Sequence, residues 1–244
     1  DLLNGKRFDK GGYILTYDYD KWSFIDPKEA QKKLNLPRNP RDYTSIAVTT
    51  DDSNDEIVYA SSMGDGVIQY KNGTPVQSYN EKNAFKETAG GYGSGYCYID
   101  GLAFDKNGNL WMTSSEVNHA VLVLDKAGAW HRLDIEQLRG VYTINDILIT
   151  STNDKWIYVP RNTPKLVMIP NSESLDEVSS YEFTTLIDTD GKELTPSNYT
   201  CVAEDKDGYI WVGTNRGAVY FTKPRISSAE DKAATRCTRV KYTN

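Results

Sequence analysis

The stretch Asp205-Lys-Asp-Gly-Tyr-Ile-Trp-Val-Gly-Thr214 decides the fold, because the chain repeats it. Asp105-Lys-Asn-Gly-Asn-Leu-Trp-Met-Thr113 is a second copy, Asn153-Asp-Lys-Trp-Ile-Tyr158 a shortened one, and Asn54-Asp-Glu-Ile-Val-Tyr59 a degenerate one without the Trp. An apolar segment precedes and follows each copy, which indicates a strand on either side. An all-β unit that recurs every roughly 45–55 residues is typical of a β-propeller with one four-stranded blade per repeat.

We therefore expect residues 1–244 to form a single all-β domain, a β-propeller of four-stranded antiparallel blades with about five blades visible. The partial first blade covers 8–26, and the later blades cover about 43–79, 99–135, 143–187 and 198–243. The partial blade, with strands Tyr13–Tyr17 and Trp22–Ile25, resembles only the outer two strands of a blade. The blades are thus predicted to form either a closed, irregular ring or part of a larger one.

The Asp-Lys-Asn/Asp-Gly segments are predicted to be the turns between the first and second strands of the blades. Asp accepts hydrogen bonds from nearby backbone amides, and Gly supplies the positive φ of a tight hairpin. A calcium loop is not indicated, because the Gly is at the fourth position rather than the sixth and no helices flank it. The tryptophans that follow the turns, Trp111, Trp156 and Trp211, are predicted to pack between blades.

Composition excludes several classes of protein. The formal charge of −6 and the isoelectric point near 5.1 argue against a nucleic-acid partner, which requires a cationic surface. No apolar run approaches the roughly 18 residues that a membrane span needs. The three cysteines have no CxxC spacing, so neither a metal site nor a disulfide framework is indicated, and Cys201 is predicted to be a packing residue.

No catalytic motif is present. The two histidines, His119 and His131, are twelve residues apart, and no GxSxG, HExxH or GxxxxGK[ST] pattern occurs. We therefore expect no enzyme activity, no catalytic residues and no cofactor. Carboxylates from different blades could still form a pair, so a polysaccharide-active enzyme stays open as an alternative.

Loops that open on one face of a propeller are the candidate recognition surface. In this fold the connections between blades and the turns between second and third strands share that face. The longest of them are Asp26–Asp42 and the Gly- and Tyr-rich Asn80–Tyr98. The candidate ligand-binding residues on these loops are Tyr92, Tyr96, Tyr98, Glu116, His119, Arg161, Asn162, Asn215 and Arg216. Arginine can bind a carboxylate and tyrosine can stack on a sugar, although ordinary solvated connectors would have the same composition.

Several segments resemble one family. Glu204–Phe221 resembles the two-component-regulator propeller repeat of Bacteroidota. Gly101–Ser115, Val121–Leu133 and Asn153–Asn171, in this order, resemble the propeller region of PorZ-type proteins, which are surface components associated with type IX secretion. Thr195–Arg225 is similar to the next blade of that region. The resemblance covers most of residues 43–225, with the departure that the second blade lacks the Trp.

The resemblance implies an extracytoplasmic location, at the cell surface or in the periplasm of a Gram-negative bacterium. It implies a non-enzymatic recognition or scaffold domain that binds a protein or an envelope polysaccharide at the channel face. Related propellers form the periplasmic ligand-sensing domains of hybrid two-component regulators, so a glycan sensor is the alternative. The family contributes no catalytic residues, and fold alone does not choose between these functions.

Overall fold

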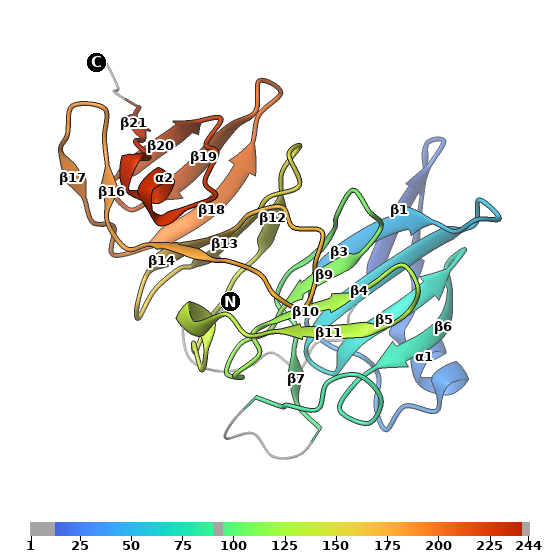
Figure 1. Cartoon of the computed structure of the whole chain (residues 1–244). Helices are drawn as coiled ribbons and strands as arrows, with labels where there is room; N and C mark the ends of the chain where they lie inside the picture. The colour runs from blue at the N-terminus through green and yellow to red at the C-terminus, as the bar shows by residue number, and fades with distance from the viewer. Residues whose placement is uncertain (1–12, 90–94, 241–244) are drawn as a thin grey trace. The chain divides into compact units, whose positions relative to one another are not determined.

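The computed structural model describes residues 13–89 and 95–240, which divide into two compact units, Asp1–Phe104 and Asp105–Asn244 (Figure 1). The chain is mostly β, as predicted, and its sheets are built from consecutive antiparallel strands. This meander connectivity within each sheet is that of a propeller blade.

The first unit contains one complete four-stranded sheet, of order β3-β4-β5-β6, and a separate two-stranded hairpin, β1-β2. The short strand β7 pairs with the end of β4. The elements are β1 (Ile14–Asp18), β2 (Lys21–Ile25), α1 (Pro27–Leu34), β3 (Tyr43–Thr50), β4 (Glu56–Gly64), β5 (Gly66–Lys71), β6 (Thr74–Tyr79), β7 (Cys97–Tyr98) and β8 (Leu102–Phe104).

The second unit contains the antiparallel run β9-β10-β11, two four-stranded sheets, β12-β13-β14-β15 and β18-β19-β20-β21, and the hairpin β16-β17. The strands are β9 (Leu110–Thr113), β10 (Val121–Leu124), β11 (Trp130–Leu133), β12 (Ile147–Ile149), β13 (Lys155–Val159), β14 (Lys165–Ile169), β15 (Tyr181–Phe183), β16 (Leu186–Ile187), β17 (Glu193–Leu194), β18 (Tyr199–Glu204), β19 (Tyr209–Thr214), β20 (Gly217–Thr222) and β21 (Thr238–Arg239). Its short helices are the 3-10 turn η2 (Glu136–Leu138) and α2 (Ala229–Ala234).

Most strands lie where the repeat predicts them, and the differences lie in the connections. The loop Asp26–Asp42 contains α1, which begins because the Asp26 side chain accepts a hydrogen bond from the Lys28 amide at 2.9 Å and Pro27 occupies the first turn. The blade predicted at 143–187 ends in two elements instead of one strand, since β15 ends at Phe183 and β16 begins a new hairpin at Leu186.

Cys201 is exposed, so the prediction that it is a packing residue is wrong. The register between β18 and β19 shifts between Tyr199 and Cys201, as in a β-bulge. A bulge interrupts the in–out alternation that the sequence pattern assumes, and Tyr199 is buried instead. All three cysteines are free thiols.

One hairpin turn recurs throughout the chain, and the Asp105 turn is its clearest example. The Asp105 amide donates to the Asn109 carbonyl, and Asp105 Oδ1 accepts from the amides of Asn107 and Asn109. Gly108 has φ +83°, which a side chain would disfavour. The turns that begin at Asp51, Asp125, Asp188 and Asp205 have the same backbone bond across four residues, and Thr150 replaces the Asp in a sixth turn. The predicted role of Asp as a turn acceptor is confirmed.

The second oxygen of each turn carboxylate contacts a polar side chain, by a hydrogen bond in four turns and by an ion pair at Asp188, which the sequence does not predict. Asp105 Oδ2 accepts from Trp111 Nε1 at 2.9 Å, and Asp205 Oδ2 from Trp211 Nε1 at 2.7 Å. The equivalent partners elsewhere are Lys71 for Asp51 at 2.6 Å, His131 for Asp125 at 3.1 Å, and Arg239 for Asp188 at 2.7 Å. One carboxylate therefore shapes the turn and also ties it to a strand.

The predicted packing of the repeated tryptophans holds for two of the three. Trp156 on β13 is buried, with its ring centroid 5.9 Å from Phe183 of its own sheet and 5.5 Å from Phe221 of the next sheet. Trp111 is buried with the Lys155 ammonium 4.3 Å from its ring centroid. Trp211 is half-buried, because it packs on Tyr220 of its own sheet at 4.9 Å rather than between two sheets.

Replacing Asp105 by Ala should cost about 2–4 kcal/mol of unfolding free energy, because it leaves the buried Trp111 indole N–H and two turn amides without their acceptor. Urea denaturation measures the loss. The matched control is Asp207→Ala, an exposed aspartate in the equivalent turn of the next repeat, which should change stability by less than about 0.5 kcal/mol. Equal losses from the two substitutions would contradict the role of the second oxygen.

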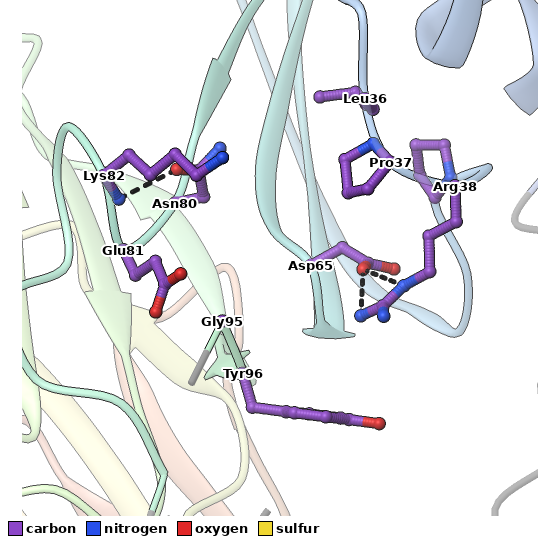
Figure 2. Close-up of a pocket in the computed structure, with 10 residues that line it drawn as sticks. Leu36, Pro37, Arg38, Asp65, Asn80, Glu81, Lys82, Gly95 and Tyr96 are labelled. Carbon is purple, nitrogen blue, oxygen red and sulfur yellow. Dashed lines mark hydrogen bonds and ion pairs between the residues drawn. The ribbon is translucent and has the colours of Figure 1, made fainter. Parts of the chain in front are cut away.

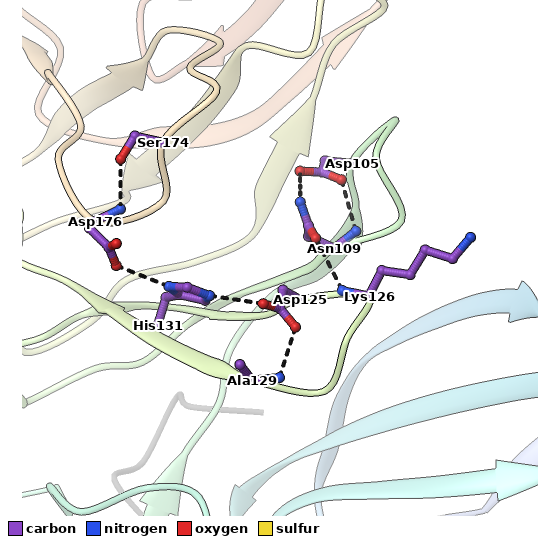
Figure 3. Close-up of polar contacts among 8 residues, drawn as sticks. All are labelled: Asp105, Asn109, Asp125, Lys126, Ala129, His131, Ser174 and Asp176. Atoms are coloured by element: carbon purple, nitrogen blue, oxygen red, sulfur yellow. Dashed lines mark hydrogen bonds and ion pairs between the residues drawn. The ribbon is translucent and has the colours of Figure 1, made fainter.

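A pH-dependent contact lies at the Asp125 turn, where His131 occupies the position that Trp has in the Asp105 and Asp205 turns (Figure 3). His131 Nε2 lies 3.1 Å from Asp125, and Nδ1 lies 3.1 Å from Asp176 in the β14–β15 connection. The hydrogen bond with Asp125 raises the pKa of His131 above its usual value, with Asp176 adding to this. A raised folded-state pKa means stabilisation below the unfolded pKa of about 6.5 and its loss as pH rises through the folded value.

His131→Gln should therefore destabilise the protein at pH 5.5 and leave it nearly unchanged at pH 8.5. The expected loss at pH 5.5 is below about 1 kcal/mol, since the site is partly solvated. Thermal melts of both proteins across this range provide the measurement, with His119→Gln as the control. A loss that is equally large at pH 8.5 would show that packing rather than charge holds the ring.

Candidate functional site

A pocket in the first unit is the candidate functional site (Figure 2). Its volume is about 230 Å³, and three segments that are distant in sequence form it: the connection after α1, the β4–β5 turn, and the connection after β6. The lining residues are Leu36, Pro37, Arg38, Pro40, Asp65, Asn80, Glu81, Lys82, Gly95 and Tyr96. These segments are two long interblade loops and one second-to-third-strand turn, the loop types that we expect on one face.

The β4–β5 turn has the sequence Gly64-Asp65-Gly66, and both glycines are required by close approaches. Gly66 has φ +79°, and a Cβ there would lie 2.1 Å from the Tyr79 carbonyl oxygen. A Cβ on Gly64, at φ +134°, would lie 3.2 Å from the Tyr96 ring. The turn can therefore approach β6 and Tyr96 closely while presenting Asp65 between the two glycines.

Asp65 fixes one wall of the pocket. Its Oδ1 accepts a hydrogen bond from Arg38 Nε at 2.7 Å, and the Arg38 terminal nitrogen lies 2.6 Å from the same oxygen. Its Oδ2 accepts from the Arg41 amide at 3.2 Å. The Arg38 guanidinium carbon lies 5.5 Å from the centroid of the Tyr96 ring, within cation–π range. Charge and stacking thus hold Asp65, Arg38 and Tyr96 in a fixed arrangement.

The opposite wall presents a carboxylate and an ammonium group. The Glu81 carboxylate lies beside Gly95, where a Cβ would be 3.4 Å from its Oε1 (Figure 2). Neither this carboxylate nor the Lys82 ammonium forms an ion pair with any residue in the described ranges. The Asn80 side chain accepts from the Lys82 amide at 2.9 Å and orients this wall. Glu81 and Lys82 are therefore available to a ligand.

Cys97 lies behind the pocket as a buried thiol. Burial raises its pKa to about 12, with the nearby charge of Glu81 adding to this. The thiol consequently stays protonated at neutral pH, so it acts as a packing group rather than a nucleophile.

The three predicted tyrosines have different outcomes. Tyr96 lines the pocket and is half-buried there, and its role in binding a ligand stays a prediction. Tyr98 is buried on β7 and packs edge-on against Tyr96 with ring centroids 6.1 Å apart, so it supports Tyr96 instead of facing a ligand. Tyr92 lies outside the described residues.

The six other predicted residues belong to three turns of the second unit, and none lines either described pocket. Glu116 and His119, in the β9–β10 turn, are half-buried, whereas Arg161 and Asn162, in the β13–β14 turn, are exposed. In the β19–β20 turn, Arg216 is exposed as well. Asn215 has a structural role, because its Oδ1 accepts from the amides of Ser197 at 2.9 Å and Asn198 at 3.2 Å.

The pocket residues that the sequence did not indicate are Arg38, Asn80, Glu81 and Lys82. The one available signal is the segment Pro37-Arg-Asn-Pro-Arg41, where two arginines follow prolines in a long loop, together with an aspartate between two glycines at 64–66. These patterns identify a constrained loop and a tight turn. They do not show that Arg38 and Asp65 meet.

A second pocket, of about 300 Å³, lies in the second unit beside the β12–β13 and β18–β19 turns. Glu204 accepts hydrogen bonds from the amide and hydroxyl of Ser151, at 2.6 and 2.5 Å, and links the two turns. Lys206, Lys223 and Arg225 also line the pocket. This pocket lies at the opposite strand ends from the second-to-third-strand turns, so the sequence analysis did not consider it.

Across residues 13–89 and 95–240, no group of three or more His, Cys, Asp and Glu side chains is arranged to hold a metal ion. No helix in these ranges is long and apolar enough to cross a membrane.

Comparison with known proteins agrees with the fold. The family model described as the two component regulator propeller matches residues 193–216, from β17 to the β19–β20 turn. PorZ, an essential bacterial surface component of the type IX secretion system of Porphyromonas gingivalis, is similar at 18% identity with a TM-score of 0.80. That similarity covers 93% of this chain and 31% of the PorZ chain. No curated protein sequence matches the chain.

A protein of a putative hybrid two component system gives a more distant match. The extracellular domain of the putative hybrid two component system BT4673 from B. thetaiotaomicron has a TM-score of 0.53 at 14% identity, over 83% of this chain and 24% of that one. This chain thus spans about a third or less of the length of both proteins. The chain has a β-propeller fold of four-stranded antiparallel blades, and its residues 193–216 match the two component regulator propeller model.

Proposed function

We propose that this chain is a non-enzymatic, extracytoplasmic recognition domain, a PorZ-like component that binds an envelope polysaccharide through the pocket of the first unit. One observation carries the proposal: Tyr96 is held in a fixed position under Arg38, opposite Glu81 and Lys82, which form no ion pair within residues 13–89 and 95–240. An aromatic ring beside hydrogen-bonding groups is an arrangement that stacks on a sugar ring and binds its hydroxyls.

Charge favours a neutral ligand. Arg38 and Lys82 contribute two positive charges to the pocket, and Asp65 and Glu81 contribute two negative ones. A strongly charged ligand would meet a group of like sign on one of the walls. The volume of about 230 Å³ is below the range of about 300–1,000 Å³ that is typical of drug-sized ligands. A single sugar unit of a longer chain suits this size.

The carboxylate arrangement supports binding rather than hydrolysis. Glycoside hydrolysis requires two carboxyl groups that flank the scissile bond, one of which gives up a proton. Both oxygens of Asp65 are already engaged, one by Arg38 and the other by the Arg41 amide. Among the described residues that line the pocket, Glu81 is then the one carboxylate without an ion-pair partner.

A ligand-sensing role in a hybrid two-component regulator is the second candidate, and the match of residues 193–216 to the regulator propeller repeat favours it. Both candidates use the same pocket. They differ in the consequence of ligand binding, because a sensor would transmit the bound state to a kinase region of the same polypeptide. The sequence that flanks this chain in its gene distinguishes them.

Substitutions in the pocket test the binding proposal. Calorimetric titration with neutral hexose oligosaccharides and with uronate oligosaccharides should show binding of a neutral one. Tyr96→Ala should weaken that binding about tenfold or more, because it removes the stacking surface, and Glu81→Gln should weaken it less. Tyr142→Ala, an exposed tyrosine in the second unit, is the matched control.

Two outcomes would contradict the proposal. One is an affinity that Tyr96→Ala and Glu81→Gln leave unchanged while both variants keep the wild-type melting temperature. The other is the absence of binding to every neutral oligosaccharide tested. Binding of the uronates alone would overturn the neutral-ligand argument, because it would mean that the positive side chains dominate recognition.

A further inference from the structure

The outward face of the β1-β2 hairpin is an exposed apolar surface in the described part of the first unit. The strand register places Leu15 opposite Phe24 and Tyr17 opposite Trp22 on this face, and Tyr13 extends it. Between 55% and 70% of each of these five side chains is exposed. Contiguous apolar patches of this kind on a soluble protein mark interaction sites.

The other face of the hairpin already packs against a sheet. Ile14 is buried in a cluster with Val58, Ala60, Ile68 and Tyr70 of β4 and β5, and Ile25 packs against the same cluster. Packing within the first unit therefore buries the side chains on one face of the hairpin, such as Ile14 and Ile25, and leaves the aromatic side chains of the opposite face exposed. The exposed face has the character of a blade face that packs on a second sheet.

The exposed rings are already ordered against one another. Tyr13 and Phe24 are edge-on with centroids 5.8 Å apart, and Tyr17 lies 4.9 Å from Trp22. The Tyr17 hydroxyl donates to Asp20 Oδ1 at 2.9 Å and fixes that ring at the hairpin tip. Rings that are held in place lose little conformational entropy when a partner covers them.

The area of this face fits an interface between two copies. An aromatic side chain buries about 150–250 Å² when fully covered, so five side chains at about 60% exposure offer roughly 600 Å². Two such faces together bury roughly 1,200 Å², which reaches the lower limit of stable specific interfaces. The five positions carry no charged side chain, so a copy of this face meets no unpaired charge.

We propose that this aromatic face, formed by Tyr13, Leu15, Tyr17, Trp22 and Phe24, binds the same face of a second copy of the chain. The contact is a two-fold, sheet-on-sheet interface in which the same five residues of both copies face one another. The tip of each hairpin adds Asp20 and Lys21, which have opposite charges and are adjacent in sequence at the edge of the proposed interface. The proposed interface shares no residue with the pocket of the first unit and does not depend on the proposed function.

Sedimentation velocity of the 244-residue chain between 1 and 100 µM tests the proposal. A dimer should form with rising concentration. Trp22→Ser combined with Phe24→Ser should weaken association at least about 100-fold, because aromatic anchors dominate such interfaces. The matched control is Ile46→Ser with Val48→Ser, which changes two exposed apolar side chains of β3 and should leave the dimer intact.

A second readout keeps the test independent of folding defects. The fluorescence emission of the wild-type protein should shift to shorter wavelength as the dimer forms, and Trp22→Tyr should abolish that shift while retaining an aromatic ring. A protein that stays monomeric at 100 µM would overturn the proposal. This holds also if the monomer binds a hydrophobic dye, which would indicate that the exposed face is covered by a partner other than a second copy. A dimer that survives the Trp22 and Phe24 substitutions would overturn it as well.

Discussion

The structure depends on an aspartate whose two carboxylate oxygens have separate partners. One oxygen accepts the amides of a tight turn, and the other accepts a side chain on a neighbouring strand, as Asp105 does with Trp111. In the turn that begins at Thr150, the first residue has one side-chain oxygen instead of two, so it can accept from the turn but not also from a strand side chain. Its hydroxyl accepts the Asp154 amide, and Trp156 depends on Phe183 and Phe221 for its position. The carboxylate thus couples a local turn to sheet packing within one residue.

This coupling explains which parts of the fold the sequence could predict. The Asp, Gly and Trp have fixed spacing, so they locate the turn and the strands on either side, and β9, β10, β11 and β13 lie where the pattern predicts. Helix α1 was missed because its signals, Asp26 and Pro27, are local to one loop and are not repeated. The bulge that exposes Cys201 is a property of strand pairing, which alternation along one strand does not contain.

The candidate site was less accessible to prediction. The sequence shows which loops are long and which turns are tight, and from topology it groups them on one face. It does not show that Arg38 and Asp65, 27 positions apart, form an ion pair, or that this pair positions Tyr96. The distinction between Tyr96 in the pocket and Tyr98 in the core arises because β7 pairs with the end of β4, a contact between segments more than thirty positions apart.

The two ends of strand β4 differ in how they are restrained. At its beginning, the Lys71 ammonium lies 2.6 Å from Asp51 and 2.8 Å from Asp55, and these contacts hold the repeated turn. At its end, the turn Gly64-Asp65-Gly66 has no such repeated contact, and Asp65 binds a loop from outside the sheet. Substitutions at the first end would alter every strand that the turn supports. At the second end, close approaches constrain Gly64 and Gly66, whereas a substitution of Asp65 alters its contacts with the loop and leaves the strand pairing in place, so this wall of the pocket can vary with little effect on the fold.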